Sequence, residues 1–159
     1  MSGSNQQRPT PGTRDDYAVY YPVTTRWADN DAYGHVNNVA FYAFFDTAVN
    51  RFLVEAGGLD IHAGPVIGYV VRSGCDYHAP VAYPQDLEVG VRVDRLGGSS
   101  VTYGVGVFAA DSASAAADGH FVHVFVDRGS GRPTPIPGAI RDALATLCPD
   151  VRERSPGTK

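Results

Sequence analysis

The sequence predicts an α+β fold in which one antiparallel sheet curls around one long helix. A strand candidate is followed by a helix that is apolar over most of its circumference, and four further strand candidates come after it. Short turns separate those strands, and short turns join antiparallel neighbours. A helix this apolar has to be covered by a sheet or by a partner subunit. The simplest packing is therefore a sheet layered on the helix.

The first third of the chain predicts a tail, a strand and the helix. Residues 1–16 are polar and rich in Pro, Gly and Ser, so we expect a flexible N-terminal tail. Residues 17–27 are β-branched and aromatic, which favours a strand, and Pro22 within it suggests an edge position or a bulge. From Val39 to about Ala56 the pattern is helical, until Gly57 and Gly58 end it. The apolar face carries Phe41, Phe44, Phe45, Ala48, Phe52 and Leu53.

The remainder predicts four strands and a short helix. Residues 67–79 form a strand candidate that Gly68 and Gly74 interrupt, and residues 87–93 and 101–109 alternate cleanly between apolar and other residues. A last long strand is expected over residues 115–127, followed by a Gly/Pro-rich loop. We expect a short helix over residues 138–147 and a C-terminal tail over residues 148–159.

Composition limits the possible functions. The 159 residues suit one domain, expected over residues 17–147. A domain of this size can bury a hydrophobic core large enough to be stable without a metal ion or a disulfide bond. The net charge of −4, with no basic run, argues against nucleic-acid binding. Cys75 and Cys148 are far apart and are expected to be free thiols in a reducing compartment. We find no signal peptide and no apolar run that would span a membrane, so we expect a cytoplasmic protein.

The chemistry is expected between Thr25 and Phe52. An acidic loop carrying Asp29 and Asp31 precedes Gly34, which allows a sharp turn, and His35 follows. Asn37 and Asn38 are side chains that can cap a helix. This places a carboxylate and a histidine ahead of a helix N-terminus, where free backbone N–H groups and the positive end of the helix dipole can hold an oxyanion.

The segment D-x-D-x-x-G-H-V-N-N, with the aromatic helix after it, resembles the hotdog-fold acyl thioesterases of the 4-hydroxybenzoyl-CoA thioesterase type. The resemblance covers residues 17–147 and is most specific from Asp31 to Asn38. It implies a hotdog fold, a homodimer or homotetramer with joined sheets, and active sites at the subunit interface. It also implies that Asp31 is the catalytic carboxylate and that the Asn38 amide polarises the thioester carbonyl.

Several residues within this resemblance keep more than one possible role. Asp31 either attacks the thioester or acts as general base on a water, and its structural alternative is to cap the loop. In plant acyl-ACP thioesterases the residue that matches His35 is catalytic, but the Asn that accompanies it there is Tyr33 here, so His35 is either a catalytic helper or a loop-holding residue. Asp29 is expected to be structural. Asn38 either donates its amide or only caps the helix.

Beyond the catalytic set, Asp31, His35 and Asn38, we expect six residues to bind substrate. They are Tyr33, Gly34, Phe41, Phe45, Asp46 and Arg72, and Arg95 and Arg132 are further candidates for CoA phosphates. Phe41 and Val49 replace a Tyr and an Arg that are usual in the family. Two further stretches match the family pattern more weakly. They are Y-H-A-P-V-A-Y-P-Q-D-L-E-V, from Tyr77, and R-P-T-P-I-P, from Arg132.

The function expected is hydrolysis of an acyl-CoA or aryl-CoA thioester, with water as the co-reactant and with no metal and no organic cofactor. The alternatives are an acyl-ACP thioesterase, a hydratase or dehydratase of acyl thioesters on the same fold, and a non-catalytic hotdog protein that binds an acyl thioester or a protein partner. Thiol release from a saturated acyl-CoA separates hydrolysis from the last two. The chain length of the acyl group stays open.

Overall fold

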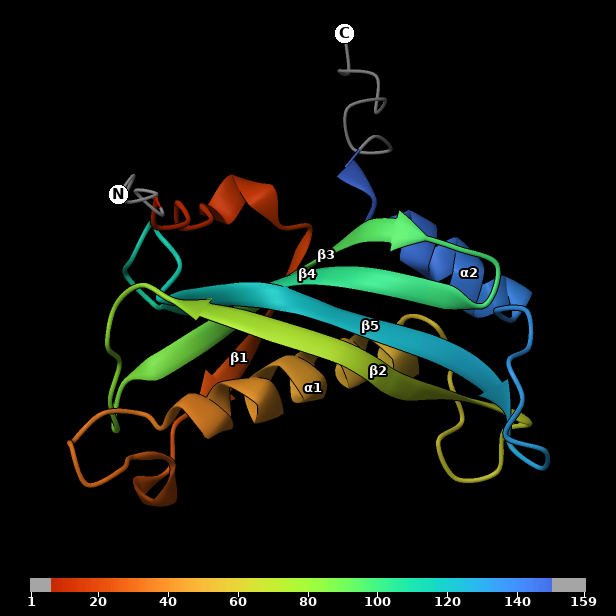
Figure 1. Cartoon of the computed structure of the whole chain (residues 1–159), viewed down its shortest axis with the longest axis horizontal. Helices are drawn as coiled ribbons and strands as arrows, with labels where there is room; N and C mark the ends of the chain where they lie inside the picture. Colours follow the sequence, from red (N-terminus) through yellow and green to blue (C-terminus); the bar gives the residue numbers. More distant parts are fainter. Residues whose placement is uncertain (1–6, 150–159) are drawn as a thin grey trace, which may run out of the picture.

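Five strands form one antiparallel sheet in the order β1-β3-β4-β5-β2 (Figure 1). The computed structural model describes residues 7–149, so the outermost parts of both expected tails, residues 1–6 and 150–159, lie outside the described residues. The elements are β1 Val19–Thr24, α1 Asn38–Glu55, β2 Val66–Tyr77, β3 Asp86–Leu96, β4 Ser100–Ala109, β5 Ala117–Asp127 and α2 Gly138–Ala145, with two 3₁₀ turns, η1 Arg14–Asp16 and η2 Trp27–Asp29.

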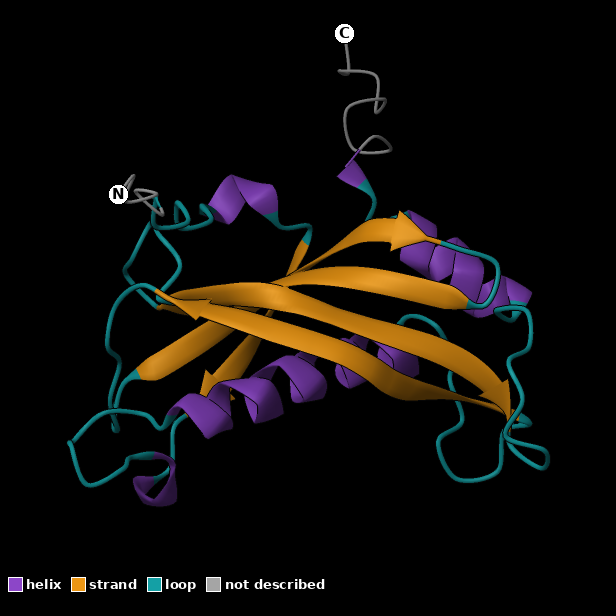
Figure 2. Ribbon diagram, in the orientation of Figure 1, coloured by secondary structure: helices purple, strands orange, loops and turns teal. Residues whose placement is uncertain are grey.

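The sheet curves over α1, which lies along one of its faces (Figure 2). Alternate residues of the strands point toward the helix, as the period of two requires, and are buried with it. The alternating residues expected on one face of β3 and β4 are all buried except the half-buried Ala109. The main core contains Phe41, Phe44, Phe45, Val49, Phe52, Leu53, Leu87, Val89, Val91, Val93, Tyr103, Val105, Phe121 and Phe125. This is the packing of sheet on helix that the sequence pattern predicts, and it is the hotdog arrangement that the family resemblance implies.

The two edges of the sheet are β1 and β2. Pro22 lies in β1, which within residues 7–149 pairs with β3 alone, so the expected edge position is confirmed. In the described part of the chain β2 pairs with β5 alone, and Tyr69, Val70 and Val71 on it are 45–59% exposed. The open hydrogen-bonding edge of β2 therefore carries exposed apolar side chains.

Two details of the predicted strands are wrong. β2 is continuous through Gly68 and Gly74, and its register shifts instead between Val70 and Arg72. The glycines leave room for neighbouring rings, because a side chain at Gly68 would meet His123 and one at Gly74 would meet His120. The first strand stops at Thr24 rather than extending to Trp27, because residues 27–29 turn as η2.

The face of the sheet away from α1 is covered in part by the segment before β1. Tyr17 lies over Gly90 and Gly106, and a Cβ at Gly106 would come within 2.5 Å of the Tyr17 hydroxyl oxygen. Thr13 forms an isolated bridge with Ser114, and the Gly12 N–H donates to the Asp118 carboxylate at 2.7 Å. Although residues 1–16 were expected to be a tail, residues 12–16 make ordered contacts with the sheet.

Neither α1 nor α2 combines the length and the apolar character needed to cross a membrane, and the same holds for every helix in residues 7–149.

Candidate active site

A tight loop carries Asp31 to the start of α1. Asn30 and Val36 form an isolated bridge, the Asp31 N–H donates to the His35 carbonyl at 2.9 Å, and the Gly34 N–H donates to the Asp31 carbonyl at 3.1 Å. Gly34 has φ 85°, a conformation that side-chain-bearing residues rarely adopt. The sharp turn predicted at Gly34 is confirmed, and it holds the backbones of Asp31 and His35 side by side.

One oxygen of the Asp31 carboxylate fixes this loop and the other is available. Oδ1 accepts the Tyr33 N–H at 2.9 Å, an Asx turn of the kind that Asp favours. Within residues 7–149, Oδ2 has no hydrogen-bond donor, and the side chain is only half-buried. Asp31 therefore holds the loop, as the structural alternative expected, and still offers an oxygen for chemistry.

Among the described residues, the first turn of α1 leaves the Asn38 backbone N–H without a partner. The Asn37 side chain caps the helix by accepting the Val39 N–H at 3.0 Å, and the Asn37 carbonyl accepts the Ala40 N–H at 2.9 Å. In the described part of the chain, the Asn38 N–H has no acceptor. Asn37 is thus the cap, and the amide of Asn38 is the unpaired donor at the positive end of the helix dipole.

A cleft of about 380 Å³ opens at this end of α1. The N-terminal end of α1 and the C-terminal end of β2 lie at the same end of the molecule (Figure 1). Across the cleft, the Tyr77 hydroxyl donates to the Asn38 carbonyl at 3.1 Å, and its ring lies edge-on to Phe41 at 5.3 Å. Burial raises the pKa of Tyr77, so the hydroxyl stays protonated as a donor. The lining residues are Asp31, His35, Val36, Asn38, Phe41, Tyr77, His78, Ala79, Pro80 and Val81.

The family model of the thioesterase-like superfamily matches residues 25–144, a span that contains the loop, α1 and the cleft. The chain belongs to this superfamily. It is a thioester hydrolase by family and fold.

Several solved structures resemble this thioesterase. The PA5185 protein from Pseudomonas aeruginosa is 59% identical, with 88% of this chain and 97% of that chain covered and a TM-score of 0.86. A thioesterase from Thermus thermophilus, complexed with coenzyme A and zinc, is 33% identical over 80% of this chain and 98% of that chain, with a TM-score of 0.68. No match was found among curated proteins.

The 1,4-dihydroxy-2-naphthoyl-CoA thioesterase Slr0204 from Synechocystis shares the fold alone. It is 21% identical, with 80% of this chain and 96% of that chain covered and a TM-score of 0.72.

Asp29, the first acid of the motif, has the structural role expected. It is 3% exposed, and its carboxylate accepts the Arg26 backbone N–H at 2.7 Å and the Arg26 guanidinium at 2.8 Å. Burial by itself would raise the pKa of Asp29, but the hydrogen bonds and charge of Arg26 outweigh it and lower that pKa below its ordinary value. Asp29 also supplies the carbonyl that accepts the Asn37 N–H at 2.8 Å, which ties η2 to the helix cap.

Four of the predicted site residues lie in the cleft of this thioesterase and five do not. Asp31, His35, Asn38 and Phe41 line it, although within the described residues His35 makes no side-chain hydrogen bond to Asp31. The side chain of Tyr33 points to solvent, 89% exposed, and Gly34 shapes the turn. The other three are apart from the cleft: Phe45 is in the core, Asp46 is exposed on α1 and Arg72 is exposed on the sheet face away from α1.

Sequence reasoning missed the wall of the cleft at the end of β2. Tyr77, the last residue of β2, and His78 and Pro80 after it lie there, and the same stretch carried one of the weaker matches to the family pattern. The sequence feature that could have indicated this wall is the Tyr-His pair at the end of a long strand, shortly before a proline. The pairing of β2 with β5 brings this pair to α1, and sequence periodicity does not reveal which strands are neighbours.

Proposed function

We propose that this thioesterase hydrolyses an acyl-CoA or aryl-CoA thioester to the free acid and CoA in the cleft at the N-terminus of α1. The observation that carries the proposal is that the Asp31 carboxylate and the unpaired Asn38 amide line the same cleft. A nucleophile or base beside an oxyanion donor is the pair that acyl transfer requires.

The Asn38 amide is suited to the oxyanion for two reasons. Its N–H is free of internal acceptors within residues 7–149, whereas the neighbouring Val39 and Ala40 amides are occupied by the Asn37 side chain and carbonyl. The helix dipole adds positive potential at the same point. An oxygen of the thioester bound there would gain stabilisation as its negative charge grows in the tetrahedral intermediate.

Asp31 would supply the attack on the carbonyl carbon, either directly through its carboxylate or by taking a proton from water. The thiolate of CoA is a good leaving group, so no strong general acid is needed for it. His35 lines the same cleft and is exposed, which is consistent with an assisting role. Phe41 and the carbon surface of Tyr77 would contact the acyl or aryl group.

CoA is the thiol we favour because the Thermus thermophilus thioesterase, 33% identical, is complexed with coenzyme A. The three candidate arginines, Arg72, Arg95 and Arg132, are exposed and none lines the cleft. Contact between any of them and the CoA phosphates would therefore involve a second subunit or a part of CoA that extends out of the cleft.

We further propose a homodimer or homotetramer in which the sheets of two subunits join along β2. The open edge of β2 and the exposed Tyr69, Val70 and Val71 support this, because an uncovered apolar edge strand is a template for pairing. Val71→Asp should give a smaller species in light scattering, whereas Ile61→Asp, at a loop residue that is 50% exposed, should not. A wild-type monomer would contradict the assembly.

The test of the activity is thiol release from acetyl-, hexanoyl-, palmitoyl- and benzoyl-CoA. We expect wild type to hydrolyse at least one of them, and the preferred chain length reports the reach of the cleft. Hydrolysis of none would contradict the proposal and would favour an acyl-thioester-binding protein. If the enzyme hydrolyses the same acyl group faster from acyl carrier protein than from CoA, the natural substrate is the acyl-carrier-protein thioester and not the CoA thioester.

A further inference from the structure

His78 lies in the candidate site and is bound by a carboxylate from outside it. Directly after β2, the backbone N–H groups of His78 and Ala79 both donate to the Ala116 carbonyl, at 2.8 and 3.0 Å. The His78 ring then places Nε2 at 3.0 Å from Oδ1 of Asp118 on β5. The two side chains are 10% and 18% exposed, so the pair is largely shielded from water.

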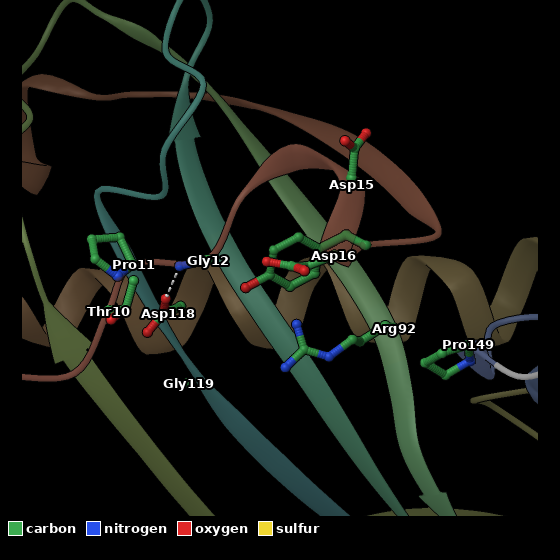
Figure 3. Close-up of a pocket in the computed structure, with 10 residues that line it drawn as sticks. Thr10, Pro11, Gly12, Asp15, Asp16, Arg92, Asp118, Gly119 and Pro149 are labelled. Atoms are coloured by element: carbon green, nitrogen blue, oxygen red, sulfur yellow. Dashed lines mark hydrogen bonds between the residues drawn. The ribbon is translucent and has the colours of Figure 1, made fainter.

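Asp118 is itself fixed by a second bond. Its Oδ2 accepts the Gly12 N–H at 2.7 Å, as the dashed line in Figure 3 shows. The carboxylate lies at a separate cavity of about 810 Å³, on the sheet face away from α1, while His78 lines the cleft. The pair thus connects the outer face of the sheet to the proposed site.

The hydrogen bonds determine which nitrogen of His78 is available. An ionised carboxylate can only accept, so the hydrogen of the neutral ring is on Nε2, directed at Asp118. Nδ1 is then an acceptor. Within residues 7–149 it has no hydrogen-bond donor, and it is not sealed from solvent. Of the two cavities, the cleft is the one that His78 lines.

We propose that His78, positioned by Asp118, is the general base for the water step of thioester hydrolysis, with Asp31 as nucleophile; this rests on the proposed function. A carboxylate that holds one imidazole nitrogen orients the ring and stabilises the imidazolium, which makes the other nitrogen an effective base. The nucleophile and the base are then different residues with separate tasks, and His78 is the catalytic residue that the motif does not contain.

The chemistry balances over two steps. Asp31 first bonds to the thioester carbonyl carbon, the C–S bond breaks and the thiolate leaves with the electron pair. Water then attacks the acyl carbon of the mixed anhydride while His78 Nδ1 takes one of its protons. The C–O bond to Asp31 breaks and its electron pair restores the carboxylate. The acid leaves with the other water proton, and the imidazolium gives its proton to the thiolate or to solvent.

With Asp31 as nucleophile and His78 as general base, variants of the two residues should differ in their transient kinetics. With the acyl-CoA that wild type hydrolyses fastest, His78→Ala should release one thiol per site in a burst and then turn over about 10²- to 10⁴-fold more slowly, with KM little changed. Added imidazole should restore part of the slow rate, because it can occupy the space of the lost ring. Asp31→Ala should show neither burst nor turnover.

Asp118→Asn tests the positioning role. It should lower kcat about tenfold or more with KM little changed and without abolishing the burst, because the ring would be less well oriented for the water step. Asp118 on β5 contacts that ring, and the other charged and titratable residues that line the cleft with His78 are Asp31 and His35 from the loop and Tyr77 from β2. His120→Ala is the matched control, since His120 is on the same strand and the same sheet face but lines neither cavity.

The possible results distinguish the proposed role of His78 from the proposed thioester hydrolysis on which it rests. If Asp31→Ala is inactive while His78→Ala keeps wild-type turnover, the assignment of His78 is overturned and the proposed function stands. Loss of the burst in His78→Ala without imidazole rescue would also overturn it, because the ring would then be needed before the water step. If wild type releases no thiol from any of the four acyl-CoAs, both are overturned.

Discussion

Asn37 holds the first turn of α1, and its replacement should have a measurable cost. Its side-chain oxygen accepts the Val39 N–H at 3.0 Å, and its own N–H donates to the Asp29 carbonyl at 2.8 Å. Asn37→Ala removes only the first of these bonds. Loss of a side-chain cap costs about 1 kcal/mol of unfolding free energy, which corresponds to a decrease in Tm of about 2–4 °C for a domain of this size.

Urea and thermal unfolding of matched variants measure this cost. Asn37→Asp keeps an acceptor and adds a charge that the helix dipole favours, so it should retain wild-type stability. Thr47→Ala is the control on the same helix: the exposed Thr47 hydroxyl only donates back to the Ala43 carbonyl, and its loss should change stability by less than about 0.5 kcal/mol. Wild-type stability in Asn37→Ala, or equal losses in the Ala and Asp variants, would refute the capping role.

Two further predictions concern the packing and the electrostatics around the site. Gly106→Ala would place a Cβ 2.5 Å from the Tyr17 hydroxyl oxygen and should cost about 1–3 kcal/mol of stability. Gly98→Ala should cost little, because within residues 7–149 its Cβ would have no atom within 4 Å beyond its two chain neighbours. Equal stability of the two would show that Tyr17 does not pack as described. Asp29→Asn should lose about 1–3 kcal/mol at neutral pH because Asp29 is buried against Arg26. The folded-state pKa of Asp29 lies below its usual 3.8, so this stabilisation is present above that value and is lost as pH falls through the folded pKa. Urea titrations should therefore show the two proteins converging in strong acid, and a constant difference down to that pH would contradict the role of the charge.

Local pattern was sufficient to predict the helix and the sheet. The period-two alternation of β3 and β4 and the apolar face of α1 are direct consequences of burial on one side, and the order of elements leaves one simple packing. The details that failed depend on partners distant in sequence. Gly68 and Gly74 suggest interruptions when β2 is considered alone, and only its pairing with β5 reveals that they accommodate His123 and His120.

The candidate site was predictable to the extent that it is local. The Asx turn, the φ 85° glycine and the helix cap all depend on residues within a few positions of Asp31. The opposite wall was not predictable, because His78 reaches the cleft through the end of β2 and is oriented by Asp118, 40 residues away. Two of the nine predicted site residues, both on α1, show the limit of prediction from the sequence. Phe41 lines the cleft, whereas Phe45, one turn later, is buried in the core.

The most direct test of the proposed site is the rate of thiol release by Asp31→Asn on the fastest acyl-CoA. This variant keeps the shape of the side chain and the oxygen that accepts the Tyr33 N–H, so the loop and the helix cap should persist, and unchanged unfolding would verify that. We expect kcat/KM to fall about 10²- to 10⁴-fold, the usual contribution of such a group. A stable Asp31→Asn variant with wild-type kcat/KM would place the chemistry elsewhere in the molecule.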